Sequence, residues 1–124
     1  MRVAIVHYHL DPGGVTRVIE AASRALGAAG IEHVILVGGG DEARMPEEFP
    51  VRRIAGLGYL TAPGDLTAEK LADTMIATAT EALGGAPDVW HFHNHSLGKN
   101  RLLPDVVARL ADAGERLVLQ IHDL

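Results

Sequence analysis

Six of the seven histidines in this chain of 124 residues stand at or near the ends of short apolar runs. They are His7 and His9 near the first run, His91, His93 and His95 near the fourth, and His122 after the fifth. An imidazole can contact a ligand, with its pKa tuned by a partner, or bind a metal. Asn94 and Asp123 stand beside these histidines and add an amide and a carboxylate. These residues predict one polar site assembled from distant parts of the chain.

A pair of glycines, Gly13-Gly14, follows the first apolar run and precedes an amphipathic stretch. Two interpretations remain open: the pair forms a tight turn, or its missing side chains let backbone N–H groups at a helix N-terminus approach a phosphate. The stretch from Gly13 to Arg17 lacks the G-x-G-x-x-G spacing of a dinucleotide site. Gly98-Lys99-Asn100 lacks the earlier Gly and the Ser/Thr of a P-loop, so both of those nucleotide-binding folds are disfavoured.

The spacing His91-x-His93-x-His95 could form a metal site, because alternate residues of a strand share one face and zinc accepts three histidine ligands. We expect the strand to end near His93, which would turn His95 away, and we therefore predict no metal site. His122-Asp123 either caps backbone groups at the end of the sheet or is a ligand-contacting histidine with a tuning partner. Arg17 could simply pair with Glu20 on the same helix.

Apolar runs alternate with amphipathic helical patterns along the chain, which is typical of βαβ units. Elements are expected as strands at 3–8, 33–37, 51–54, 88–93 and 116–121, with helices at 15–29, 67–83 and 103–113. Thr67 is the expected N-cap of the second helix. The segments 41–50 and 55–66 are expected to be loops.

This pattern predicts a Rossmann-like three-layer αβα domain with a parallel sheet of strand order 3-2-1-4-5. In that order the first, fourth and fifth strands are neighbours, and ligands bind beyond the carboxyl ends of the strands at the switch point between the first and fourth. The histidine-rich strand ends would then converge on one crevice.

The composition excludes several classes of protein. The net charge of −5 argues against a nucleic-acid partner, which usually requires a basic surface. The absence of cysteine rules out disulfides and thiolate metal sites. No apolar run approaches the roughly 20 residues that span a bilayer, and the first run is too short for a signal peptide, so we expect a cytoplasmic protein with no transmembrane segment.

Three segments of the chain resemble the N-terminal part of retaining glycosyltransferases of family 4, which have the GT-B fold. The first is the strand, Gly-Gly loop and Arg-bearing helix leading into Gly-Ile-Glu-His-Val-Ile-Leu-Val. The second, Asp88 to His95, is similar to the family's "D-v-v-H-x-H-n" strand. The third, Leu117 to Asp123, is similar to its "v-x-T-x-H-D" strand. The three segments occur in the family's order and span nearly the whole chain.

The resemblance implies transfer of a sugar from a nucleotide-sugar donor to an acceptor hydroxyl, with retention at the anomeric carbon and no cofactor. Gly13 and Gly14 would present amides to the donor pyrophosphate, and Arg17 would add positive charge there. His122 with Asp123 would lie near the transferred sugar. The acceptor-binding residues would be His9, His93, Asn94 and His95.

The sequence also departs from the family. Gln120 stands where the family often has Thr, and Glu32-His33 reverses the family's usual His-Glu order. Val15-Thr16 replaces a common pair of a small and an acidic residue before Arg17. These departures leave the transferred sugar unassigned. No two Glu residues are eight apart, so the Glu-x7-Glu pair of the donor-binding domain is absent. We therefore expect residues 1–124 to be a single, incomplete N-terminal domain, inactive alone because catalysis needs both reactants held in geometry. Its fifth strand, left partly uncovered, would favour self-association.

Three other functions remain open at this point. The chain could be a stand-alone Rossmann-like module that binds a small anionic ligand without chemistry. It could be a fragment of a nucleotide-sugar epimerase, which shares the architecture. It could also be a metal-binding protein that uses the histidines of the fourth strand.

Overall fold

The computed structural model describes residues 1–39 and 48–122. Asp123, expected beside His122 in the site, lies outside the described residues, as does the part of the first expected loop that covers residues 41–47.

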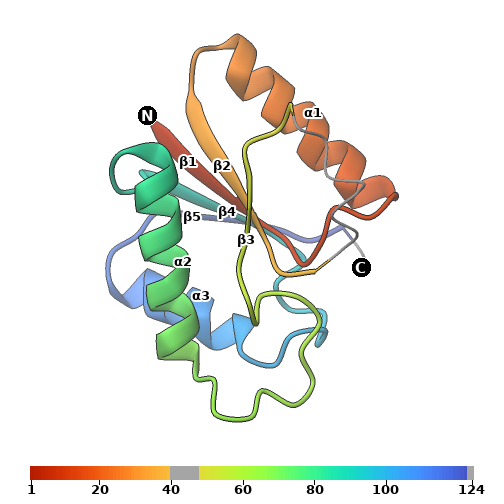
Figure 1. Cartoon of the computed structure of the whole chain (residues 1–124), viewed down its shortest axis with the longest axis vertical. Helices are drawn as coiled ribbons and strands as arrows, with labels where there is room; N and C mark the ends of the chain where they lie inside the picture. Colours follow the sequence, from red (N-terminus) through yellow and green to blue (C-terminus); the bar gives the residue numbers. More distant parts are fainter. Residues whose placement is uncertain (40–47, 123–124) are drawn as a thin grey trace.

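Strands and helices alternate in the predicted order (Figure 1). The strands are β1 (Arg2–Val6), β2 (Glu32–Val37), β3 (Val51–Arg53), β4 (Val89–His93) and β5 (Leu117–Gln120). The helices are α1 (Gly14–Ala28), α2 (Ala68–Leu83) and α3 (Leu103–Asp112). No helix among the described residues is long and apolar enough to cross a membrane.

The five strands form one parallel sheet in the order β3-β2-β1-β4-β5, which confirms the predicted Rossmann-like topology. The central strand β1 pairs with β2 on one side and β4 on the other, so Ile5 lies between Ile35 and His91. The point at which the chain changes direction across the sheet is therefore between β1 and β4, the expected position of a ligand site in this architecture.

Helices cover the two faces of the sheet unequally, as Figure 1 shows, with α1 on one face and α2 and α3 on the other. The larger core packs alternate strand residues such as Val6, Leu36 and Trp90 against Leu71 of α2 and Leu110 of α3. The smaller core joins β1 and β2 to α1: its buried members are Val3, Ile5, Leu10, Ile19, Ile35, Val37 and Phe49. Because side chains alternate along a strand, every strand contributes to both faces.

The α1 face changes from apolar to polar where the sheet passes from β1 to β4. His91 pairs in register with Ile5 and Val118, and His93 pairs with Gln120, so these side chains share the face on which α1 packs. The smaller core includes no residue of β4 or β5. The histidines of β4 therefore lie beside the core under α1 rather than within it.

Local signals explain most element boundaries. Thr67 caps α2 as predicted, its hydroxyl accepting a hydrogen bond from the Lys70 backbone N–H at 3.1 Å, and Gly84 ends the helix in the left-handed conformation (φ 71°). The first strand ends two residues earlier than predicted. His7 and Tyr8 are buried like strand residues, but the Tyr8 carbonyl accepts hydrogen bonds from Gly38 and Gly39, which draws the chain out of the ladder.

Candidate functional site

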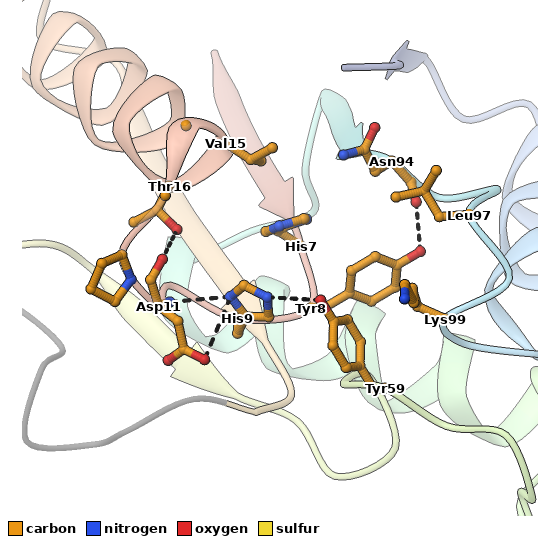
Figure 2. A pocket seen from close by; sticks show the side chains of 13 residues that line it. His7, Tyr8, His9, Asp11, Val15, Thr16, Tyr59, Asn94, Leu97 and Lys99 are labelled. Atoms are coloured by element: carbon orange, nitrogen blue, oxygen red, sulfur yellow. Dashed lines mark hydrogen bonds and ion pairs between the residues drawn. The ribbon is translucent and has the colours of Figure 1, made fainter. Parts of the chain in front are cut away.

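A cavity of about 230 Å³ opens beyond the carboxyl ends of β1 and β4. Three segments form its wall: residues 7–9 and 11–16 after β1, Tyr59 after β3, and Asn94, Leu97 and Lys99 after β4 (Figure 2). This is smaller than the ~300–1,000 Å³ of sites for drug-sized ligands, so it suits one sugar ring or one small anion. The position is the one that the predicted strand order implies.

Gly13 and Gly14 lie in the cavity wall at the N-terminus of α1. Gly13 has no side chain to cap the helix, and no acidic residue lies in the first turn. Its backbone is extended (φ 163°, ψ 176°), a conformation open to any residue. A Cβ at Gly14 would meet nothing within 4 Å, and one at Gly13 would meet only the Asp11 carbonyl at 3.9 Å. Packing and backbone geometry therefore do not require glycine at either position.

His9 lies in the cavity wall, between Asp11 and Tyr59 (Figure 2). Its Nδ1 accepts a hydrogen bond from the Asp11 backbone N–H at 3.1 Å, and its Nε2 lies 3.1 Å from the Tyr59 hydroxyl. A neutral His9 that accepts at Nδ1 carries its proton on Nε2. It therefore donates to the Tyr59 oxygen and leaves the Tyr59 hydroxyl proton for another acceptor. The Asp11 carboxylate, 3.9 Å from Nδ1, pairs with the imidazole when it is protonated.

His7 contributes a neutral imidazole to the wall. Burial is the main cause that lowers its pKa to about 4, and the nearby His9 and His122 lower it further. Its Nδ1 lies 3.2 Å from the backbone carbonyl of His93, which can only accept, so Nδ1 carries the proton and Nε2 is left as an acceptor. Such a group can accept a hydrogen bond from a hydroxyl at neutral pH.

His93 lies behind the cavity wall and is 1% exposed. Its ring stacks between those of His91 and His122, with centroid distances of 4.3 and 5.1 Å. Its Nδ1 is 2.8 Å from Nε2 of His122, while its own Nε2 is buried without a partner. Burial first, and then the neighbouring imidazoles, lower the pKa of His93 to about 3, so His93 is uncharged near pH 7. His93 therefore orients His122 rather than facing the cavity.

Asn94 holds the ends of β4 and β5 together. It adopts the left-handed conformation (φ 54°), which asparagine tolerates better than most residues. Its side-chain oxygen accepts from the His122 backbone N–H at 2.8 Å, its own N–H donates to the Gln120 carbonyl at 2.8 Å, and its carbonyl accepts from the Tyr8 hydroxyl. The residue lines the cavity, but much of its hydrogen-bonding capacity serves the fold.

The remaining predicted site residues lie away from the cavity wall. β4 ends at His93 and the turn at Asn94 takes His95 off the strand face, as expected. His122 is half-buried against His93, and Arg17 is exposed on α1. Gln120, a departure from the family pattern, accepts a hydrogen bond from Nε2 of His91 at 2.9 Å. Of the nine predicted residues, the cavity wall includes Gly13, Gly14, His9 and Asn94.

Sequence reasoning missed Tyr59, Lys99 and Tyr8, which also line the cavity. Tyr59 belongs to the segment after β3, for which the sequence predicts only a loop. β3 and β4 are not neighbours in the sheet, so strand order gives no reason for their loops to meet. Asn100 is a signal of contact between loops, because asparagine side chains favour loop hydrogen bonding. The residue type alone does not show which loop it contacts.

No protein-family model matches this chain, and no curated protein is significantly similar to it. The family resemblance therefore stays a prediction, and function must be argued from the site itself.

Proposed function

We propose that this chain is the acceptor-side Rossmann-like part of a retaining glycosyltransferase, which transfers a sugar from a nucleotide-sugar to an acceptor hydroxyl. Three features support the proposal. The cavity lies at the switch point of a parallel sheet, where such folds bind ligands. Its wall combines a helix N-terminus, neutral imidazole and hydroxyl groups. The polar strand ends that resemble family 4 meet at this same edge.

The observation that carries the proposal is the pair Gly13-Gly14. The fold does not need glycine at either position, yet both line the cavity at the start of α1. Absent side chains let a ligand approach the backbone N–H groups, and a helix N-terminus favours negative charge. A ligand phosphate explains both glycines, whereas the tight-turn interpretation explains neither.

In this proposal different groups bind different parts of the substrates. The amides at Gly13 and Gly14 hold the donor pyrophosphate. The neutral His7, whose Nε2 is left as an acceptor, is placed to hydrogen-bond a sugar hydroxyl, because it lines the wall. His122 lies outside the cavity wall, and its contact with the transferred sugar is assigned from the family resemblance alone. Its ring is oriented by the 2.8 Å contact with His93, and its backbone N–H donates to the Asn94 side chain. The proposal needs no metal or cofactor. Arg17, exposed on α1, contributes charge near the phosphates only as a long-range effect.

The test is calorimetric titration of the 124-residue chain with UDP, GDP and ADP. We expect weak binding of at least one diphosphate. Gly14→Ala should weaken it about tenfold, a loss of ~1.4 kcal/mol, because a methyl group would stand between phosphate and amide. Gly27→Ala is the matched control, since it lies on the same helix outside this cavity and its Cβ also meets nothing within 4 Å.

Equal affinities of the wild type and Gly14→Ala would remove the glycine pair from the site and refute the phosphate assignment. Absence of binding to all three diphosphates would refute it as well. Sugar turnover by these 124 residues alone would contradict the incomplete-domain part of the proposal, because a donor-binding half would then be unnecessary.

A further inference from the structure

Tyr59 and Lys99 stand side by side at the mouth of the cavity, although 40 positions separate them in the sequence. The Lys99 ammonium lies 5.5 Å from the centroid of the Tyr59 ring. The ring also contacts Tyr8 and His9, edge to face, at centroid distances of 5.3 and 5.4 Å. Despite these contacts the Tyr59 side chain is 60% exposed. Figure 2 shows both side chains on the side of His9 opposite to Asp11.

A buried hydrogen-bond network fixes this pair. Asn100 is 0% exposed, and its amide nitrogen donates to the carbonyls of Gly56 and Gly58, both at 2.7 Å. Its side-chain oxygen accepts from Leu102 and Leu103 at the start of α3. All four hydrogen-bonding positions of the Asn100 amide are used. They fix the loop after β3 to the loop between β4 and α3.

The backbone joins the same loops directly beside the pair. Leu60 N–H donates to the Lys99 carbonyl at 2.7 Å, and Arg101 N–H donates to the Leu60 carbonyl at 2.9 Å. Leu60 and Asn100 thus form an isolated parallel bridge, with Tyr59 and Lys99 one position before each. The juxtaposition of ring and ammonium is therefore built into the fold and does not depend on the contact between the two side chains.

Positive and negative side chains lie at different ends of the cavity. Among the described residues that line it, Lys99 is the one Lys or Arg and Asp11 the one acidic residue. Asp11 lies beside His9, and no salt bridge joins Lys99 to a carboxylate within residues 1–39 and 48–122. The low pKa of His7, about 4, keeps this side chain uncharged at neutral pH. The Tyr59–Lys99 end is therefore the positive end.

We propose that Tyr59 and Lys99 form a subsite for an acceptor sugar that carries a phosphate or carboxylate group. The inference rests on the proposed transferase function and names the substrate class of its acceptor. The electron-rich face of Tyr59 packs against the C–H groups of a sugar ring. Its hydroxyl proton, left available by the His9 hydrogen bond, donates to a ring substituent. The Lys99 ammonium pairs with the anionic group.

The test compares matched probes by NMR titration of the full 124-residue chain: glucose, glucose 6-phosphate, glucuronate and inorganic phosphate. We expect glucose 6-phosphate and glucuronate to bind about fivefold more tightly than glucose, the upper end for a solvent-accessible ion pair. Lys99→Gln should abolish this preference. Lys70→Gln is the control, since Lys70 is the other lysine of the chain and is exposed on α2 outside the cavity.

Tyr59→Ala should weaken binding of all three sugars, whereas Tyr59→Phe should keep the contribution of the ring and lose that of the hydroxyl. Equal affinity for glucose and its two anionic counterparts would overturn the proposal. Binding of inorganic phosphate as tight as that of glucose 6-phosphate would also overturn it, since the ring would then contribute nothing. The sugar titrations test the subsite, and the diphosphate titration of Gly14→Ala tests the proposed function. Either can therefore fail without the other.

Discussion

The histidines of this chain differ in pKa and in contacts because their surroundings differ. His9 stands in the cavity wall, where its two ring nitrogens hydrogen-bond the Asp11 backbone N–H and the Tyr59 hydroxyl. His7 and His93 are buried, and burial lowers their pKa to about 4 and about 3. The same side chain is therefore a hydrogen-bonded polar group at His9, a neutral group of the cavity wall at His7 and a buried structural group at His93.

The burial of His7 and His93 predicts that the free energy of unfolding falls in acid. Above pH 6.5, the ordinary pKa of histidine, His7 and His93 are neutral in both the folded and unfolded states. As pH falls below 6.5, only the unfolded chain gains these protons until the folded values near 4 and 3 are reached. The free energy of unfolding should drop by up to about 1.4 kcal/mol per pH unit for each histidine.

Urea unfolding between pH 7 and pH 4.5 measures this effect. His93→Gln should reduce the acid-dependent loss, because this group no longer titrates. Ala77→Gln, a neutral change on the exposed side of α2, should leave the pH dependence unchanged. A wild-type stability that is flat over this range would show that the two imidazoles are not held neutral.

At the scale of elements, the cavity depends on how closely the end of β2 approaches the loop after β3. A Cβ at Gly38 would lie 1.9 Å from the backbone nitrogen of Gly58, and a backbone atom cannot rotate away. Gly38→Ala should therefore destabilise the fold by about 1–3 kcal/mol, the usual cost of overpacking. It should also displace the loop that holds Tyr59.

Gly39→Ala provides the comparison for this substitution. Its Cβ would meet only the Tyr8 carbonyl at 3.8 Å, an ordinary contact, so we expect a change of no more than about 0.5 kcal/mol. Urea midpoints of the two variants measure the difference. Similar midpoints would mean that the loop yields freely and that the Tyr59 position is not fixed by this packing.

The order of the elements was predictable because periodicity and turn residues are local properties. The apolar stripe of α2, its Thr67 cap and the left-handed Gly84 all act within one or two helical turns. The strand order is that of a doubly wound sheet, and it placed Gly13, Gly14, His9 and Asn94 at one edge. Tyr59 and Lys99 could not be predicted in this way, because a single buried amide, Asn100, joins loops of strands that are not neighbours.

At the scale of the whole molecule, β5 is an edge strand with apolar side chains exposed on both faces. Val118 is 47% exposed and Leu119 43% exposed, and alternation places them on opposite faces of the sheet. Unpaired strand edges with apolar side chains promote association between copies. Residues 1–124 are therefore expected to self-associate, with a mass that rises with protein concentration.

Light scattering across a concentration series tests this expectation. Val118→Lys should shift the protein toward the monomer, because an exposed charge opposes pairing along the edge. Val18→Lys makes the same change at a 40% exposed position on α1 and should leave association unaltered. A wild type that stays monomeric at high concentration would contradict the account of the β5 edge.

The central claim is that the first turn of α1 holds the phosphates of a nucleotide-sugar. Backbone amide NMR of the 13.2 kDa chain during titration with UDP-glucose, ADP-glucose and GDP-glucose tests it most directly. The account predicts that the largest shift changes occur at the amides of Gly13, Gly14 and Val15, with smaller changes at His9. Changes confined to another part of the chain, or none with any of the three, would contradict it.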